Sequence, residues 1–147
     1  MAVEQRPGLE LPGDERTLTL LRERALAAME RAYAPYSGFR VGAALLASDG
    51  SVSEGCNVEN AALPAGICAE RAAVAAAVSR GNRSFDVVLI ATEADEPTPP
   101  CGTCRQVLNE FSPHVLVIAA TRNGREARWT LDELFPKAFT AHSLDRR

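Results

Sequence analysis

Apolar and polar residues recur along the chain in patterns that predict four helices. Between Thr17 and Ala32, apolar residues return every three or four positions, which is typical of an amphipathic helix packed on a core. The sequence over 67–81 is alanine-rich and ends in a glycine, and the sequence over 102–111 also favours a helix. Thr130 and Glu133 have the spacing of a capping box, which predicts the start of a short fourth helix.

Five apolar stretches between these helices predict the strands of one sheet. They span residues 39–48, 51–59, 85–93, 114–121 and 125–131. Asp49-Gly50 and Asn123-Gly124 are turn signals, so the first two strands and the last two strands are expected to form hairpins. The resulting order is helix, two strands, helix, strand, helix, two strands, helix. This order predicts an α/β fold, a three-layer α/β/α sandwich with a mixed sheet of about five strands.

Length and composition place these elements in one compact domain. The chain has 147 residues, of which 46% are hydrophobic and 24% are charged, as in an ordinary globular protein with a sizeable core. Proline and glycine are frequent before the first predicted helix. We therefore expect a flexible tail over residues 1–13 and a single domain over residues 14–147.

Charge and hydropathy argue against several classes of partner. The formal net charge is -3 and the pI is about 5.4, without any run of Lys or Arg, so nucleic-acid binding is not expected. No segment is apolar over the length of a membrane span, and the first residues lack the pattern of a signal or transit peptide. We expect a cytoplasmic protein, and in a reducing compartment closely spaced cysteines are more often metal or redox sites than disulfides.

Three of the four cysteines fall at the predicted starts of helices. Cys68 precedes the alanine-rich helix, and Cys101 and Cys104 form a Cys-x-x-Cys pair where the next helix begins. The free N–H groups and the dipole of a first helical turn stabilise thiolates, the form in which cysteine binds metal. Three cysteines around Zn²⁺ would leave the fourth tetrahedral position open, as in catalytic zinc sites. Cys56 has no spaced partner and is interpreted as a small apolar core residue.

Glu70 is the candidate general acid/base because it follows Cys68 by two positions. A carboxylate there could lean over the open metal position and move protons to and from a water. Taken alone, such a residue is more typical of a surface glutamate that stabilises a first helical turn. A lone Cys-x-x-Cys pair could likewise be a thioredoxin-like redox motif. The combination of Cys-x-Glu with a later Pro-Cys-x-x-Cys is what favours a catalytic zinc site.

At these residues the chain resembles the zinc-dependent cytidine deaminases of the small homotetrameric type. The resemblance covers residues 33–139 and rests on five blocks, which read PYSGFRVGAALL, GCNVENA, GICAERAA, PCGTCRQVL and ELFPKAF. It implies a cytidine deaminase-like fold and one Zn²⁺ per chain, held by Cys68, Cys101 and Cys104. It also implies that Glu70 is the proton shuttle and not a metal ligand.

The resemblance further implies a site for a small nucleoside. Asn57 and Glu59 would hydrogen-bond the ribose 3′-hydroxyl, since an amide and a carboxylate can together donate to and accept from one hydroxyl. Phe39 would pack on the pyrimidine ring, and Ala69 would also contact the substrate. Phe139 would come from a neighbouring subunit, so the resemblance implies a homotetramer with shared active sites.

Arg71 matches an arginine that hydrogen-bonds a ligand thiolate in the three-cysteine members of this family. Three thiolates around Zn²⁺ carry a net negative charge, which weakens the acidifying effect of the metal on water. A guanidinium beside them would offset part of that charge. Without the resemblance, Arg71 would be interpreted as a solvated residue on a helix surface.

The implied function is hydrolytic deamination of cytidine and deoxycytidine in pyrimidine salvage. An alternative on the same fold is a deaminase of a modified nucleoside or a nucleoside antibiotic, which Asn57 and Glu59 disfavour because they would address an unmodified ribose hydroxyl. A structural zinc or redox module without catalysis would have no use for Glu70 beside an open metal position.

Two departures from the family pattern stand out in the sequence. Leu63 stands where many members of the family carry an aromatic residue, a neighbourhood that the family uses near the site and the subunit contact. The stretch EADEPTPP over residues 93–100 is a long loop that ends in tandem prolines before Cys101. We expect this loop to lie outside the chemistry.

Overall fold

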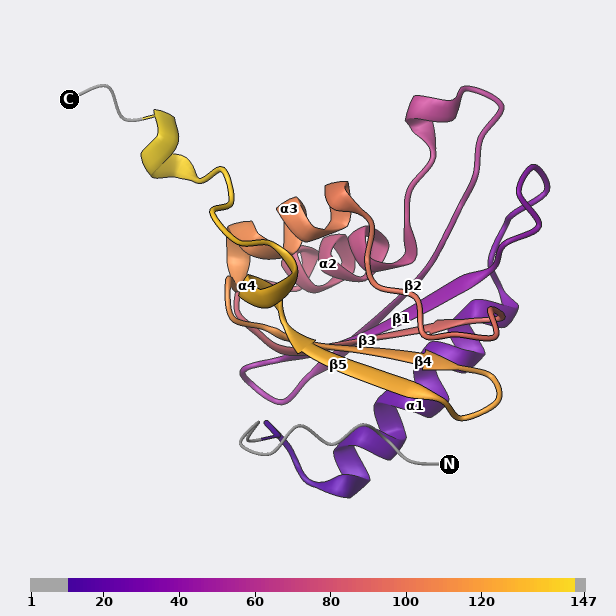
Figure 1. Ribbon diagram of the computed structural model, residues 1–147, viewed down its shortest axis with the longest axis horizontal. Helices are drawn as coiled ribbons and strands as arrows, with labels where there is room; N and C mark the ends of the chain where they lie inside the picture. Colours follow the sequence, from indigo (N-terminus) through magenta and orange to yellow (C-terminus); the bar gives the residue numbers. More distant parts are fainter. Residues whose placement is uncertain (1–10, 145–147) are drawn as a thin grey trace.

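The computed structural model describes residues 11–144 as a mixed sheet with helices on both faces (Figure 1). The helices are α1 (Glu15–Glu30), α2 (Ala69–Ser79), α3 (Gly102–Phe111) and α4 (Leu131–Leu134), with 3₁₀ turns at Leu63–Ala65 and Ala141–Leu144. The strands are β1 (Val41–Ala47), β2 (Val52–Cys56), β3 (Phe85–Thr92), β4 (Leu116–Thr121) and β5 (Glu126–Thr130). This confirms the predicted sandwich. The tail expected over 1–13 lies mostly outside the described residues and stays a prediction.

The sheet has the strand order β2-β1-β3-β4-β5. Strand β1 runs antiparallel to both β2 and β3, strand β4 runs parallel to β3, and β5 is antiparallel to β4. The two predicted hairpins are present, with Gly50 and Gly124 at φ 88° and 85° in their turns. Helix α3 connects the parallel pair β3 and β4, as a parallel connection requires a crossover.

Helix α1 covers one face of the sheet. The Asp14 side chain accepts a hydrogen bond from the backbone N–H of Thr17 at 2.9 Å, so the helix begins two residues earlier than the hydrophobic pattern alone predicts. Its buried side chains are Leu18, Leu21, Ala25, Ala28 and Met29. The helix lies very close to β1, and only the lack of a side chain at Gly42 allows this approach. A Cβ at that position would come within 1.9 Å of the Ala25 carbonyl oxygen.

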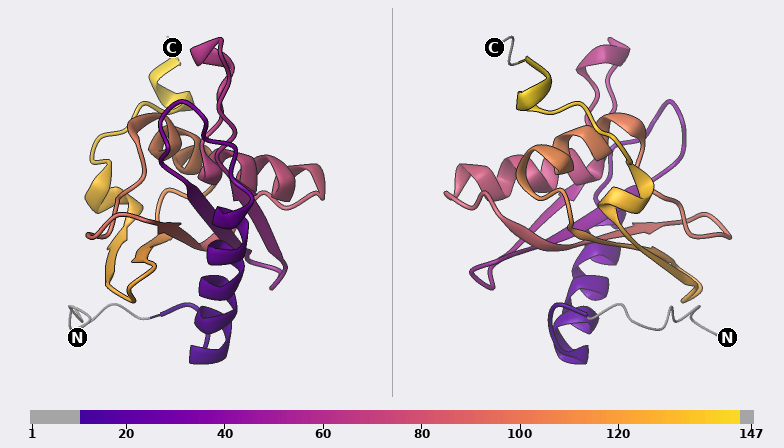
Figure 2. Two further views of the ribbon diagram at one scale, coloured as in Figure 1. Left: turned by 90° about the vertical axis from the view of Figure 1, so that its right-hand side faces the viewer. Right: turned by 60° about the vertical axis from the view of Figure 1, so that its left-hand side comes forward.

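Helices α2 and α3 cover the opposite face, as the two views of Figure 2 show. The core on this side contains Ala73, Ala77, Val88, Ile90, Leu108 and Val117, among others. Helix α2 lies directly on β2 because Gly55 has no side chain. A Cβ at that position would lie 2.4 Å from the Ala69 carbonyl oxygen and 2.5 Å from the Ala73 nitrogen. This close approach fixes where the first turn of α2 sits above the sheet.

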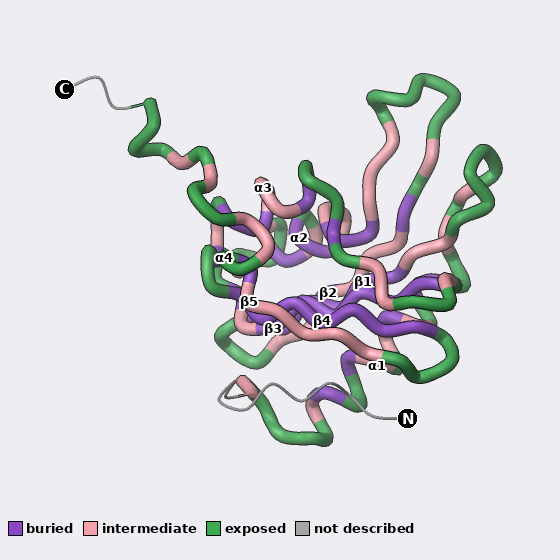
Figure 3. Tube along the Cα trace, in the orientation of Figure 1, coloured by how far each residue is buried: buried purple, intermediate pink, exposed green. Residues whose placement is uncertain are grey.

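Burial is greatest in the strands and lowest in two connections and the C-terminal segment (Figure 3). The segments over 33–39 and 58–65 project beyond the sheet and are mostly exposed. The chain that follows α4 leads away from the sandwich (Figure 1). Within residues 11–144, no helix has both the length and the apolar character that crossing a membrane requires.

Candidate active site and metal centre

The three predicted zinc ligands lie together where two helices begin. Cys68 is the N-cap of α2 and Cys101 is the N-cap of α3, while Cys104 is buried in the first turn of α3. Their sulfur atoms all lie within 4.8 Å of one another. The Cys68 and Cys101 sulfurs are 3.8 Å apart, and the Cys101 and Cys104 sulfurs are 3.3 Å apart.

These distances fit a tetrahedral metal ion. Zinc–sulfur bonds of about 2.3 Å place neighbouring sulfurs roughly 3.8 Å apart. The donor set is all sulfur and supplies three ligands, so one tetrahedral position would stay open to a water. Cys56 is not part of the group and is half-buried in β2, which agrees with its interpretation as a non-ligand, although it is less buried than expected.

Electrostatics favour a thiolate in this cluster. Hydrogen bonding with Cys104 and with Arg71 lowers the pKa of Cys68 to about 5. The Arg71 Nη2 atom lies 3.8 Å from the Cys68 sulfur and 3.5 Å from the Gly66 carbonyl oxygen. The hydrogen bond with Cys68 in turn raises the pKa of Arg71. The structure therefore places the positive charge of Arg71 against the Cys68 sulfur.

Glu70 is the buried carboxyl group of this site. It lies in the first turn of α2 and is only 5% exposed. Burial raises the pKa of Glu70, and the Cys68 thiolate acts in the same direction. A carboxyl group whose pKa is raised is better suited to accepting and returning a proton than an exposed carboxylate. The interpretation as a solvated surface glutamate is therefore wrong.

A cavity of about 230 Å³ connects Glu70 to the predicted nucleoside-binding residues. Its lining includes Phe39, Asn57, Glu59, Cys68, Ala69, Glu70 and Cys101. Residues from four separate stretches of the sequence therefore meet around one space. The volume is smaller than that of typical pockets for drug-sized ligands, as expected for a small heterocycle.

Asn57 and Glu59 line the cavity and also form hydrogen bonds with the backbone of its wall. The Asn57 Oδ1 atom accepts a hydrogen bond from the Val41 N–H at 2.8 Å, and its Nδ2 donates to the Phe39 carbonyl at 2.8 Å. An amide has two donor hydrogens and two acceptor lone pairs, so one of each is left for a ligand. The Glu59 carboxylate likewise accepts hydrogen bonds from the backbone of Tyr36 and keeps capacity on its other oxygen.

Phe139 is not brought to the cavity of its own chain. Its side chain is 56% exposed, and it does not line the cavity that contains Glu70. Its carbonyl oxygen accepts a hydrogen bond from Gln106 Nε2 at 2.9 Å, which ties this segment to α3.

The loop before Cys101 reaches the cavity, although the sequence predicts that it lies outside the chemistry. Thr98 and Pro99 line the cavity, together with Thr92 at the end of β3. The loop folds back because Arg105 Nε donates to the Pro100 carbonyl at 2.8 Å. For Thr92 the sequence gives one signal, its place at the end of a predicted strand. For the path of the loop the sequence gives no signal.

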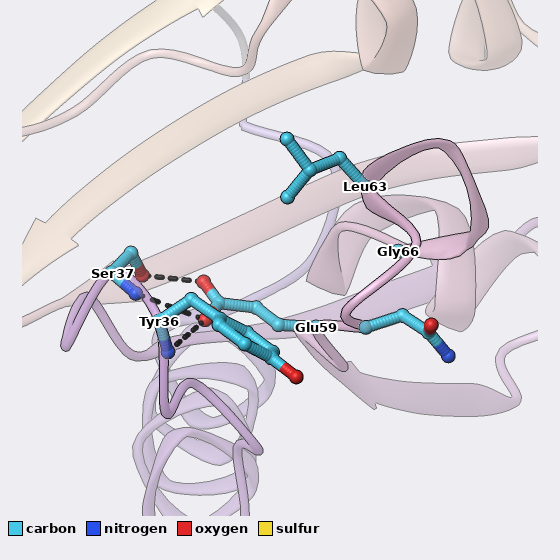
Figure 4. Close-up of a pocket in the computed structure, with 6 residues that line it drawn as sticks. Tyr36, Ser37, Glu59, Leu63 and Gly66 are labelled. Atoms are coloured by element: carbon cyan, nitrogen blue, oxygen red, sulfur yellow. Dashed lines mark hydrogen bonds between the residues drawn. The ribbon is translucent and has the colours of Figure 1, made fainter.

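A second hollow lies on the far side of Glu59, with a volume of about 380 Å³. Figure 4 shows Tyr36, Ser37, Glu59, Leu63 and Gly66 around it. Leu63 is 79% exposed and projects from the 3₁₀ turn that follows the Asn57–Glu59 segment. The position that departs from the family pattern thus lines the same hollow as the predicted ribose-binding carboxylate.

Comparison with known proteins agrees with this geometry. Residues 16–120 match the family described as the cytidine and deoxycytidylate deaminase zinc-binding region. A cytidine deaminase from Halalkalibacterium halodurans is 48% identical over 129 residues, which are 86% of this chain and 96% of the relative. A blasticidin-S deaminase from Bacillus cereus is 30% identical over 108 residues, which are 68% of this chain and 76% of that protein.

Solved structures show the same relationship. The crystal structure of cytidine deaminase from Burkholderia pseudomallei has a TM-score of 0.79 to this chain at 44% identity, and the match covers 82% of this chain and 98% of that one. The stretch matched by the family model contains all three clustered cysteines and Glu70. From its sequence, its fold and this cluster, the chain belongs to the cytidine and deoxycytidylate deaminase zinc-binding family.

Proposed function

We propose that the chain is a zinc-dependent cytidine deaminase that converts cytidine and deoxycytidine to uridine and deoxyuridine with release of ammonia. One observation carries this proposal. The buried carboxyl group of Glu70 shares a small cavity with two clustered thiols, and the polar side chains of Asn57 and Glu59 line the same cavity. A cavity built in this way combines proton transfer, a metal centre and a place for a sugar hydroxyl.

The residues of the site suit hydrolysis at C4 of a cytosine ring. Zinc held by Cys68, Cys101 and Cys104 would supply a Lewis acid that acidifies the attacking water. Glu70 accepts a proton from that water and delivers it to N3, which makes C4 electrophilic. A new C4–O bond then forms. Glu70 carries the second proton of the water to the amino group, the C4–N bond breaks, and ammonia leaves.

Other residues of the cavity would position the nucleoside for this reaction. Phe39 would pack on the pyrimidine ring, and Ala69, which is fully buried at the start of α2, would contact the base. Asn57 and Glu59 would bind the ribose 3′-hydroxyl through the hydrogen-bonding capacity that their backbone contacts leave free. Arg71 would offset the negative charge of the thiolates.

We further propose a cytoplasmic role in pyrimidine salvage and a homotetramer in which Phe139 completes the cavity of a neighbouring subunit. Phe139 is exposed and lies outside the cavity of its own chain, which supports this assignment. Helix α2 also carries two small residues that are at least partly exposed, Ala75 and Ala76. Such a surface allows another helix to approach closely.

The assembly is tested by light scattering and by mixing variants. Phe139→Ala chains and Glu70→Gln chains should each be nearly inactive alone. Mixed tetramers should regain activity at sites that combine the Glu70 of one chain with the Phe139 of another. A fully active monomer, or mixtures no more active than their components, would refute the shared site.

The activity is tested by the change in ultraviolet absorbance when purified zinc-loaded protein is mixed with cytidine, deoxycytidine or cytosine. We expect turnover of both nucleosides and little of the free base, because cytosine has no ribose for Asn57 and Glu59 to bind. Turnover of blasticidin S without turnover of cytidine would refute the proposal and favour the antibiotic deaminase.

A further inference from the structure

A tight turn over residues 34–39 carries one wall of the substrate cavity. The Gly38 N–H donates to the Ala34 carbonyl at 3.0 Å, and Gly38 has φ 67°, a conformation that favours glycine. The preceding residue, Ser37, is exposed, and its side chain turns inward toward Glu59 (Figure 4). Ser37 and Phe39 both line the cavity that contains Glu70.

The Glu59 carboxylate is held by this turn through three hydrogen bonds. Its Oε1 atom accepts from the Tyr36 N–H at 2.9 Å and from the Ser37 N–H at 3.0 Å, while its Oε2 atom accepts from the Ser37 hydroxyl. A carboxylate oxygen has two lone pairs. Oε1 is therefore fully used, and Oε2 keeps a single free lone pair.

The Ser37 hydroxyl can serve Glu59 in only one orientation. Its oxygen accepts a hydrogen bond from the Phe39 N–H at 3.0 Å. Its proton is therefore directed to Glu59 Oε2. These hydrogen bonds lower the pKa of Glu59, so the carboxylate stays ionised and accepts hydrogen bonds only.

Glu59 and Ser37 also separate two spaces. Both residues line the cavity that contains Glu70, and both line the second hollow beside Leu63. The carboxylate could rotate toward either space if it were held by its backbone contacts alone. The hydroxyl of Ser37 is the side-chain contact that fixes the second oxygen.

We propose that Ser37 is a positioning residue that fixes Glu59 as the acceptor for the sugar hydroxyl of the substrate. The assignment rests on the proposed function. Ser37 does not touch the reacting atoms. It acts by orienting the free lone pair of Glu59 Oε2, so it should govern how strongly the enzyme prefers a substrate that has a 3′-hydroxyl.

The test compares cytidine with 3′-deoxycytidine in the wild type and in Ser37→Ala, Ser37→Thr and Ser48→Ala. Ser48 is the matched control, because its hydroxyl donates to the Asp86 carboxylate at 2.8 Å and it does not line the cavity. Ser37→Ala should raise KM for cytidine about tenfold, the effect of losing one hydrogen bond to a charged group. Its kcat and zinc content should change less than about threefold, because Glu70 and the thiols are untouched.

Two further results are expected. KM for 3′-deoxycytidine should change less than about threefold in Ser37→Ala, because that substrate has no hydroxyl for Glu59 to accept. Ser37→Thr keeps the hydroxyl and should show the wild-type preference for cytidine over 3′-deoxycytidine. Ser48→Ala should show the same preference as the wild type.

The outcomes separate the two proposals. Equal KM increases for both substrates in Ser37→Ala would show a merely structural role and overturn the assignment of Ser37. Wild-type KM values in Ser37→Ala would overturn it as well. Failure of the wild-type enzyme to deaminate cytidine would refute the proposed function itself, and the role of Ser37 with it.

Discussion

Gly55 lies where β2 meets α2, and replacing it tests whether the packing of that helix sets the geometry of the active site. A Cβ at position 55 would meet the first turn of α2 at the Ala69 carbonyl oxygen and the Ala73 nitrogen. These are backbone atoms, so they cannot rotate away as a side chain could. The same turn carries Cys68 and Glu70, and it must move if Gly55→Ala is to fold.

The size of the movement follows from the contact distances. The new Cβ would lie 2.4 Å from the nearest atom, whereas ordinary contacts begin at 3.4 Å, so α2 must retreat by about 1 Å. Overpacking of this kind costs about 1–3 kcal/mol, or roughly 3–10 °C in Tm for a chain of this size. A displacement of about 1 Å at catalytic groups lowers rates on the order of a hundredfold.

Gly42→Ala is the matched control on the opposite face of the sheet. Its Cβ would lie 1.9 Å from the Ala25 carbonyl oxygen, so α1 must move instead of α2. We expect a loss of Tm at least as large as in Gly55→Ala, with kcat/KM within about threefold of the wild type. Thermal unfolding, zinc content and cytidine turnover at a temperature where both variants are folded provide the comparison.

Wild-type kcat/KM and zinc content in Gly55→Ala, together with a lowered Tm, would contradict this expectation. That result would mean that α2 absorbs the new methyl group without moving its first turn. Equal losses of activity in both variants would also refute it, because general destabilisation would then explain the effect.

Three further predictions follow from the site and from a partly buried ion pair. Cys104→Ala should abolish stoichiometric zinc binding, measured by metal analysis, because two sulfur ligands hold zinc much more weakly than three. Glu70→Gln should keep zinc and stability but lose several orders of magnitude in kcat, and near-normal turnover would refute its role. Burial alone would raise the pKa of Glu126, but hydrogen bonds from Arg22 and Arg128 outweigh it and lower that pKa. Its stabilisation is therefore present above about pH 4.5 and lost as the pH falls through the lowered pKa. Glu126→Gln should cost about 2 kcal/mol of unfolding free energy at pH 7, the effect of weakened hydrogen bonds to charged groups. Urea denaturation should show this difference shrinking below about pH 4.

The metal centre could be predicted from sequence because its determinants are local. Cys68 is recognisable as a helix N-cap from the alanine-rich stretch that follows it. Cys101 likewise precedes a stretch, residues 102–111, that favours a helix. The chemistry of three thiols then points to a metal without knowledge of the tertiary fold. What brings Cys68 to Cys101 is the packing of two helices on one sheet face, and the family resemblance supplied that pairing.

The element boundaries were less predictable where the chain leaves the sheet. The second strand was expected to continue to Glu59, but β2 ends at Cys56. Val58 instead forms isolated bridges with Tyr33, in the exposed segment over 33–39, and with Ile67, just before α2. Hydrophobic alternation does not distinguish a strand within a sheet from an extended segment that pairs with a loop.

Contacts between distant residues were not predictable from any local pattern. Arg22 on α1 and Glu126 on β5 are hydrogen-bonded although 104 positions separate them. The loop over 93–100 folds back toward the cavity through the hydrogen bond from Arg105 on α3 to Pro100. Each contact depends on how helices and strands are arranged in space. The sequence pattern predicts that these elements form, but not how they are arranged. The same limit explains why the sequence does not predict that Thr98 lines the cavity.

The residues that face the substrate also hold the cavity together, and this limits how their mutants can be interpreted. Asn57 is hydrogen-bonded to both Phe39 and Val41, so removing its amide would loosen β1 as well as weaken any contact with ribose. Glu59 likewise supports the turn that carries Ser37. A rise in KM after substitution of either residue would therefore combine lost binding with lost order. A substrate that lacks one hydroxyl separates the two effects, since it removes the ligand contact and leaves every protein contact in place.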